Sequence, residues 1–316
     1  MRIDLAGWSR DATLGGHREF LAFFEAAERM GFDGVWFHEF RLQAEPWPYP
    51  CPLLLAAALL ARTERLRVGT SVLVSALHEP ALLAEQIAQL QFQGQGRFDA
   101  GIGRGTDPQT LTAMGISADQ TRERFEQTMA LLQAQASSSA PEHARAPHLF
   151  VAASSQSSID EAVRVRVPLL LSLEPPEATQ LERLALSPAQ SPQQLQWMRQ
   201  HSSLSRYVCI GQTAQEVQEQ LESLWPLLWH RRLYFAGKRG VAPHEVPPLD
   251  RTSMLREQFI HGTPDQCWEQ IQQTVAQTGS RHWRLVFNAN GLWSRETAAQ
   301  GMRLFSQTLL SPLQRL

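Results

Sequence analysis

The chain has 316 residues, 43% of them hydrophobic, and a formal net charge of -2. This length and apolar content are enough for one large α/β domain or two smaller ones. A net charge so close to zero provides no field that would draw the protein to nucleic acid or to an anionic membrane. We therefore expect a small molecule as its main partner.

The cysteines and the hydropathy narrow the choice further. Cys51, Cys209 and Cys267 are odd in number, far apart and without a CxxC pair, so neither a disulfide framework nor a metal site is predicted. The N-terminus lacks the apolar core of a signal peptide, and no stretch reaches the roughly 18 apolar residues of a membrane span. We expect a cytoplasmic protein.

Short β-type runs alternate with helical patterns along the chain. The predicted strands are residues 1–6, 34–37, 66–74, 97–103, 148–153, 167–173, 206–211 and 282–287. The predicted helices are residues 17–31, 52–63, 79–91, 120–135, 157–165, 177–186, 213–225 and 294–310. Apolar strands joined by helical crossovers pair in parallel, so these units predict an α/β fold, a (β/α)8 TIM barrel, with a doubly wound sheet as the alternative.

Two segments interrupt this alternation. Residues 135–147 are predicted to be a polar surface loop, and residues 234–259 place prolines and glycines among charged side chains. The second segment fits either a lid over an active site or a solvated loop. We expect a single domain over residues 1–316, with an insertion or lid at about 234–260.

The stretch GIGRGTDPQT, residues 101–110, has three alternating glycines. It lacks the third glycine of the dinucleotide fingerprint and follows the fourth strand instead of the first, so a Rossmann site is not predicted. In a barrel, the residues after a strand face the active-site mouth, which would place Arg104 and Asp107 there. The flanking glycines let the backbone approach a ligand, and an arginine suits a phosphate.

A second candidate anion site follows the fifth predicted strand. Ser154, Ser155, Ser157 and Ser158 lie at the start of a predicted helix, where hydroxyl and backbone N–H groups can bind phosphate oxygens. Serines at this position also cap helices without binding any ligand. Both interpretations stay open.

Taken in order, these motifs resemble those of the flavin-dependent, bacterial-luciferase-like monooxygenases. The similar stretches cover nearly the whole chain: residues 27–40, 61–90, 94–116, 148–162, 260–279 and 287–313. The resemblance implies an eight-stranded βα barrel. It also implies oxidation of a small organic substrate with O2 and reduced FMN. We find no nicotinamide fingerprint, which favours a two-component system in which a separate flavin reductase supplies the reduced FMN.

The resemblance also implies roles for individual residues. Arg104, next to Gly105, and Arg122 match arginines near the flavin phosphate. Ala153, Ser154, Ser155 and Ser157 match the phosphate loop. Glu39 matches an acid near the flavin. Ser71 and Val72 match the strand end beneath the flavin ring, where the family often has a non-prolyl cis peptide bond.

One position departs from the family pattern. Many members have Glu-His-His after the second strand, whereas this chain has Glu39, Phe40 and Arg41. His38 precedes Glu39, and strand alternation would point it to the opposite face. We keep His38 and Glu39 as the catalytic candidates. The alternatives are an oxidoreductase that uses the deazaflavin F420, and a non-catalytic flavin-binding relative or partner subunit.

Further expectations concern the substrate and the assembly. Trp8, Trp36, Phe37 and Phe40 would form an apolar wall of the pocket, although Trp36 fits the barrel core better. Few charges are predicted at the strand ends, which favours an apolar substrate. Family members commonly dimerise through barrel helices, and residues 52–61 and 80–91 are apolar enough to form a homodimer interface.

Overall fold

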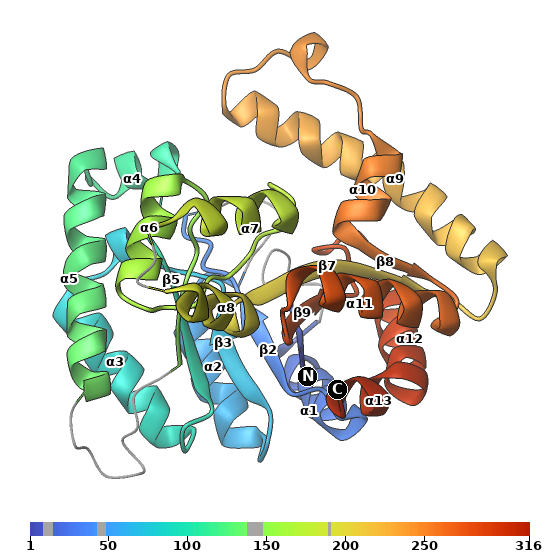
Figure 1. Cartoon of the computed structure of the whole chain (residues 1–316), viewed down its shortest axis with the longest axis horizontal. Coiled ribbons are helices and arrows are strands. Elements are labelled where there is room, and N and C mark those ends of the chain that lie inside the picture. Colours follow the sequence, from blue (N-terminus) through green and yellow to red (C-terminus); the bar gives the residue numbers. More distant parts are fainter. Residues whose placement is uncertain (9–14, 43–48, 106, 138–147, 189–190) are drawn as a thin grey trace.

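Parallel strands enclosed by helices make up the protein, seen here in a computed structural model (Figure 1). It describes residues 1–8, 15–42, 49–105, 107–137, 148–188 and 191–316. The strands are β1 (Arg2–Leu5), β2 (Gly34–Phe37), β3 (Arg67–Thr70), β4 (Leu73–Val74), β5 (Phe98–Gly103), β6 (His148–Val151), β7 (Ser203–Ile210), β8 (Phe259–Gly262) and β9 (His282–Val286).

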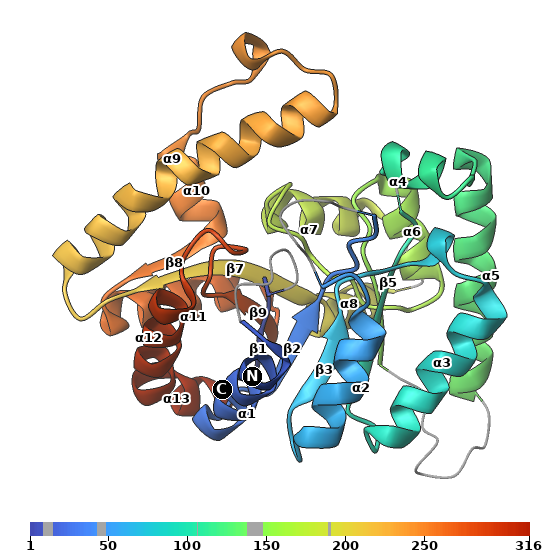
Figure 2. The same cartoon turned by 180° about the vertical axis from the view of Figure 1, so that it is seen from behind.

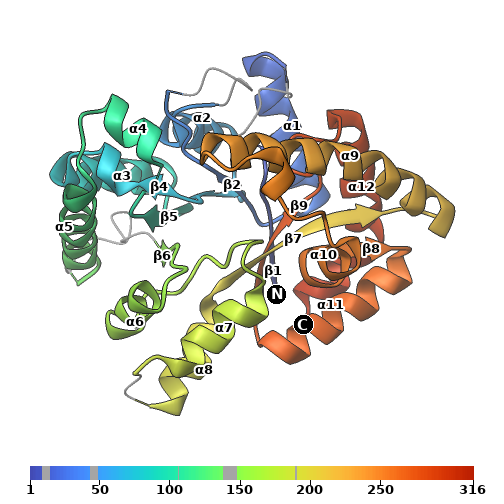
Figure 3. The same ribbon diagram turned by 90° about the horizontal axis from the view of Figure 1, so that it is seen from above.

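Helices follow most of these strands. They are α1 (His17–Met30), α2 (Pro52–Arg62), η1 (Ser75–Leu77), α3 (Pro80–Gln93), α4 (Pro108–Ala113), α5 (Ala118–Ser137), α6 (Gln156–Arg164), α7 (Glu177–Leu186), α8 (Pro192–His201), α9 (Ala214–Lys238), η3 (Pro243–Glu245), α10 (Arg251–Gln258), α11 (Pro264–Thr278), α12 (Arg295–Phe305), η4 (Ser306–Leu310) and α13 (Ser311–Gln314). Seen from above, most of them surround the strands (Figure 3).

The strands form the predicted barrel. β1 pairs with β2 on one side and with β9 on the other, so the first and last strands meet. The ring continues through β3, β5 and β6 in one direction and through β7 in the other. Residues 169 and 170 close it through single bridges, in which Leu170 N donates to Val151 O and Leu171 N to Ser203 O, both at 2.9 Å. This is the (β/α)8 arrangement that the strand count predicts.

Two strand predictions need correction, and one strand of the structure is not predicted. Residues 167–173 form only those bridges, because Pro168 has no N–H and Ser172 N donates to the side chain of Gln180 instead. The run 66–74 is two strands, β3 and β4, separated by a cis Ser71–Val72 peptide bond. The additional strand β8 pairs with residues 207–210 of β7, whereas β9 pairs with residues 203–207, so only Tyr207 is shared.

The predicted insertion at about 234–260 is partly helical. It contains the end of α9, η3, α10 and the first residues of β8. α9 extends well past the predicted end at residue 225, and α9 and α10 project from the barrel (Figures 1 and 2). Arg231 of α9 donates to the backbone oxygens of Ala289 (3.0 Å) and Asn290 (2.8 Å), which follow β9. The helix is thereby attached to the carboxyl end of the barrel, and a role as a lid stays a prediction.

Three of the four aromatic side chains predicted for the pocket wall, Trp8, Trp36 and Phe37, are buried in the core. Trp8 and Phe37 are buried against α1, where Trp8 contacts Phe23 and Phe24, and Phe37 contacts Phe24. The expected wall is therefore wrong for these two. Trp36 lies inside the barrel, as its strand position favours.

The three cysteines are free thiols. Cys209 and Cys267 are buried free thiols whose pKa values burial raises to about 12, and Cys51 is half-buried. Among the helices of the described ranges, none is long and apolar enough to cross a membrane. Residues 138–147 of the predicted polar loop lie outside the described residues.

Candidate active site at the barrel mouth

Charged side chains fill the barrel interior near the amino-terminal ends of β1, β3 and β5. Successive strand residues point to opposite faces, so every second residue of each strand faces inward. Arg2 and Asp4 of β1 meet Asp99 of β5: Arg2 contacts Asp99 at 2.5 Å and Asp4 at 2.6 Å. Arg67 of β3 contacts Asp99 from the other side, also at 2.5 Å. Each aspartate therefore has an arginine partner.

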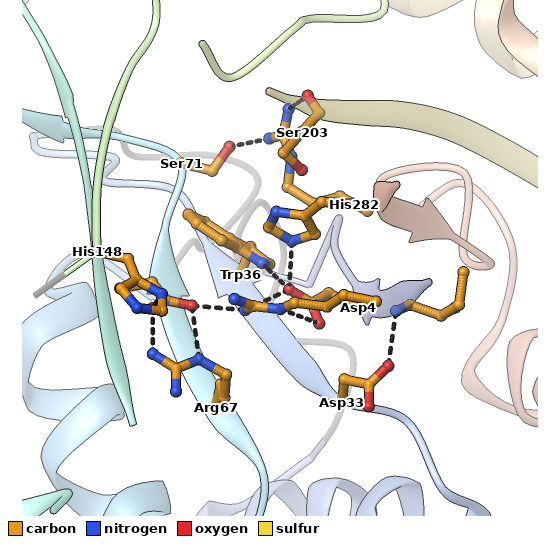
Figure 4. Close-up of polar contacts among 12 residues, drawn as sticks. Asp4, Asp33, Trp36, Arg67, Ser71, His148, Ser203 and His282 are labelled. Carbon is orange, nitrogen blue, oxygen red and sulfur yellow. Dashed lines mark hydrogen bonds and ion pairs between the residues drawn. The ribbon is translucent and has the colours of Figure 1, made fainter. Parts of the chain in front are cut away.

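Two ring N–H groups complete the environment of Asp4. Figure 4 shows Trp36 and His282 converging on its carboxylate, with Nε1 of Trp36 at 2.6 Å and Nε2 of His282 at 2.8 Å. Burial alone would raise the pKa of Asp4, but Arg2 and His282 hold it well below its usual range. Burial, aided by the charge of Arg2, lowers the pKa of His282 to about 4. His282 is therefore neutral at physiological pH and donates to Asp4.

Above this layer, the barrel opens into a cavity of about 270 Å³. The lining comes from the carboxyl ends of several strands, as expected of a barrel active site. The lining residues are Ala6, His38, Ser71, Val72, Ala152, Leu170, Ser172, Leu173, Ser205, Arg284, Val286 and Asn290. Six of these residues are apolar and six are polar or charged, and a cavity with apolar walls and convergent polar groups is the usual form of a small-molecule site.

His38 and Glu39 point to different places. His38 lines the cavity and stacks on Phe40 with ring centroids 5.8 Å apart, whereas Glu39 is not among the lining residues. The two side chains therefore point in different directions, as strand alternation predicts. Phe40, at the position of the family histidine, packs on His38.

The Glu39 carboxylate organises the rim of the barrel. It accepts from Val74 N (2.8 Å) and Arg41 Nε (2.7 Å), and its two oxygens lie 2.9 and 3.0 Å from His78 Nε2. Burial alone would raise the pKa of Glu39, but the hydrogen bond and charge of His78, with Val74 N and Arg41, keep it below its usual value. The carboxylate thus joins the end of β2 to the loop between β3 and α3.

The alternating glycines of residues 101–105 pack against residues 70–74. A Cβ at Gly101 would overlap Thr70 O, one at Gly103 would overlap Val72, and one at Gly105 would overlap Val74. Gly105 also has a φ of 86°, which other residues rarely adopt. The three glycines, called the glycine stripe below, let the segment with the cis bond lie close to β5.

The predicted phosphate residues lie outside this cavity, on neighbouring loops. Ile102 O accepts from Ala152 N at 3.0 Å, so the loops that carry Arg104 and Ser154 leave adjacent strands at the same edge. Arg104 is exposed, as are Ser154, Ser155 and Ser157.

The serines cap a helix, as the alternative interpretation states. Ser155 Oγ caps α6 by accepting from Ser158 N at 3.3 Å, and lies 3.3 Å from Ser157 Oγ. Ala153, before them, is buried. Arg122 stays apart on the surface of α5, paired with Glu126 at 2.8 Å. Asp107 caps α4, accepting from Thr110 N at 3.2 Å.

Sequence reasoning missed two residues of the site. His78 precedes α3 in a His-Glu-Pro run that also reads as a helix start, and only the contact with Glu39 places it at the rim. Arg284 sits in the middle of β9, and its position every second residue from His282 was the one available signal that it faces inward. In the part of the chain that is described, no group of metal-ligating side chains occurs.

Comparison with known proteins adds to this geometry. A sequence profile of luciferase-like monooxygenases matches residues 4–282. The chain belongs to the luciferase-like monooxygenase family.

Several of the curated relatives have the cofactor F420 in their names. The chain is 36% identical over 109 residues to the F420-dependent glucose-6-phosphate dehydrogenase of Kineococcus radiotolerans, a match that covers 33% of this chain and 31% of that protein. The chain matches about a third of the length of the first curated relatives.

Solved structures of similar fold cover nearly the whole chain. The monooxygenase RslO1 from Streptomyces bottropensis superposes with a TM-score of 0.77 at 23% identity, covering 99% of both chains. The oxygenating constituent of 3,6-diketocamphane monooxygenase from Pseudomonas putida, in complex with FMN, gives 0.69 at 17% identity, covering 98% of both chains. At these identities the likeness establishes the luciferase-like TIM-barrel fold.

Proposed function

We propose that the protein is an FMN-dependent monooxygenase that oxidises a small, largely apolar organic molecule with O2. The observation that carries this is the cavity at the barrel mouth. It combines apolar lining from Leu170, Leu173 and Val286 with polar groups from His38 and Ser71. Reduced flavin, when bound, would supply the electrons that activate O2, and the apolar lining would keep water from the reacting centre.

The loops beside the cavity fit the phosphate of such a cofactor. The hydroxyls of Ser155 and Ser157 lie at the N-terminus of α6, a nine-residue helix whose first N–H groups have no partner within the helix. Arg104 stands exposed on the loop beside it. In this proposal Arg104, Ser154, Ser155 and Ser157 hold the phosphate, with Gly105 and Ala153 shaping the loops.

The remaining candidate residues would contact the flavin ring, move a proton or position the rim, and one of them is held away from the phosphate. Arg122 is bound to Glu126, so it would reach the phosphate only by giving up that pair. Ser71 and Val72 line the cavity and would contact the ring. His38 is the candidate for moving a proton there, and Glu39 positions the rim through His78.

The partners in this proposal are a separate flavin reductase and a second copy of the chain. Leu54 of α2 and Leu82 of α3 are 71% and 58% exposed on adjacent helices, which supports a homodimer through this face. We keep the cytoplasmic location as part of the proposal. A monomer in sedimentation equilibrium would contradict the homodimer.

Cofactor binding tests the proposal directly. Anaerobic titrations with reduced FMN and with F420 should show tighter binding of FMN. Because a charge-assisted hydrogen bond to phosphate contributes about 1.5–3 kcal/mol, Arg104→Gln should weaken FMN binding at least about tenfold. Riboflavin, which has no phosphate, should bind wild type and Arg104→Gln equally.

The controls separate the parts of the proposal. Arg303→Gln changes an exposed arginine of α12 and should leave FMN binding unchanged. Tighter binding of F420 would favour the alternative that the curated relatives suggest, an F420-dependent oxidoreductase. Binding of flavin without O2-dependent product would favour a non-catalytic relative. Rapid NADH oxidation with FMN and no added reductase would contradict the two-component scheme.

A further inference from the structure

Arg284 is a buried arginine that faces the barrel-mouth cavity. Its side chain is only 3% exposed, and it lines the cavity together with His38 and Ser71. Nη1 donates to Ser71 Oγ at 2.6 Å, and Nε donates to Ser203 Oγ at 3.0 Å. Nη2 donates to Leu171 O at 2.6 Å and to Ser203 O at 3.4 Å. These contacts fix the guanidinium in the cavity wall.

All of these hydrogen-bond partners are neutral oxygens, and the guanidinium also lies over the ring of Trp36, 5.8 Å from the ring centroid. Across the described ranges of the chain, no carboxylate forms an ion pair with Arg284. The two aspartates of the barrel interior, Asp4 and Asp99, are already paired with Arg2 and Arg67. Among the described residues, the interior therefore has three arginines and two aspartates, and the positive charge in excess lies next to the cavity.

A buried guanidinium without a counter-ion is costly, because neutral oxygens replace only part of its hydration. Burial lowers the pKa of Arg284 to about 10, although the charge of Asp4, which forms no ion pair with it, acts in the opposite direction, so the group stays charged at neutral pH. His282, two residues earlier, is neutral at that pH and does not add to the charge. Of the five guanidinium N–H groups, the four contacts above use four, which leaves one for a ligand.

We propose that Arg284 makes this cavity a binding site for the anionic group of a ligand, a delocalised oxyanion such as a carboxylate or an enolate. Such a group would neutralise the excess charge and accept the remaining N–H group. Two molecules could carry it: an organic acid substrate, or a reduced flavin, which is an anion near neutral pH. The second case rests on the proposed function, whereas the first does not.

Two pairs of probes test the proposal on wild-type protein. Benzoate and benzamide have the same ring and similar size but differ in charge, and calorimetric titration should show benzoate binding at least about tenfold tighter. Reduced and oxidised FMN form the second pair, and the reduced form should bind tighter if the flavin carries the anion. A preference for the anion in either pair supports the proposal and identifies its source.

Variants then assign the preference to Arg284. Arg284→Gln removes the charge and should abolish the preference, whereas Arg284→Lys keeps the charge and should retain part of it. The exposed Arg303→Gln should bind as wild type does. If wild-type protein prefers the anion in neither pair, or if Arg284→Gln keeps the preference, the proposal is wrong. The benzoate pair uses no flavin, so failure of the proposed function would show only in the FMN titrations.

Discussion

At the scale of single residues, Glu39 is a candidate from the sequence whose carboxylate does not line the barrel-mouth cavity. Its oxygens accept from His78, Arg41 and Val74 N, and its pKa is held below the usual value. A carboxylate with a lowered pKa and several bound donors is a weak base at neutral pH. We therefore propose a positioning role for Glu39 and keep His38, which lines the cavity, as the candidate for moving a proton.

Glu39→Gln tests this role through stability. The side chain is fully buried, so loss of its charge would leave Arg41 without a counter-ion and weaken the hydrogen bond with His78, and we expect a loss of about 1–3 kcal/mol in unfolding free energy. Urea denaturation measures it. The matched control is Glu126→Gln, which breaks the exposed pair with Arg122 and should cost at most about 0.5 kcal/mol. Equal losses for the two variants would contradict the positioning role.

At the scale of elements, the glycine stripe explains a motif that resembles a nucleotide loop. Gly101, Gly103 and Gly105 repeat every second residue, as do the residues 70, 72 and 74 that they face. Thr70 Oγ1 strengthens this contact by accepting from Gly101 N at 3.1 Å and donating to Gly101 O at 3.0 Å. The stripe therefore fixes the position of the strand end that lines the cavity.

A double-mutant cycle checks the stripe. Gly103→Ala would overlap the Val72 side chain and should cost about 1–3 kcal/mol in unfolding free energy. The same substitution combined with Val72→Ala should cost less than the two single changes added together, because the smaller side chain makes room. Gly237→Ala, in the exposed part of α9 with no atom within 4 Å, should instead stabilise by about 0.5–1 kcal/mol. Additive losses would show that the two residues do not interact.

At the scale of the whole molecule, the barrel interior couples stability to pH. Burial and the charge of Arg2 lower the pKa of His282 to about 4 in the folded protein, against 6.5 for the free group. Below pH 6.5 the unfolded chain therefore binds a proton that the folded protein does not. The contribution of His282 to the unfolding free energy is fully present above pH 6.5. It declines as the pH falls toward about 4, the pKa of His282 in the folded protein.

We expect His282 to cost about 2 kcal/mol of unfolding free energy between about pH 7 and pH 5. His282→Gln keeps a donor for Asp4 but does not titrate, so its stability should change less over the same range. The difference between the two proteins isolates this residue from His148, whose pKa burial also lowers. Urea midpoints measured in steps of pH give the result. Parallel curves for the two proteins would show that His282 does not titrate as inferred.

The sequence predicts the barrel well, because alternating strands and helices are local patterns with few three-dimensional solutions. It also predicts the cis Ser71–Val72 bond, through family resemblance. It fails where the partner of a residue lies far along the chain. His78 lies 39 positions from Glu39, and Arg284 lies 213 positions from Ser71, so neither contact leaves a local pattern.

By itself, the sequence determined the fold class, the family and the order of the loops that meet at the barrel mouth. Only the tertiary structure decided which side chains face the cavity, that the glycine stripe serves packing, and that one arginine inside the barrel has no carboxylate partner among the described residues. The physical reason is that periodicity fixes the direction of each strand residue, whereas charge balance and close contact depend on which strands become neighbours when the ring closes.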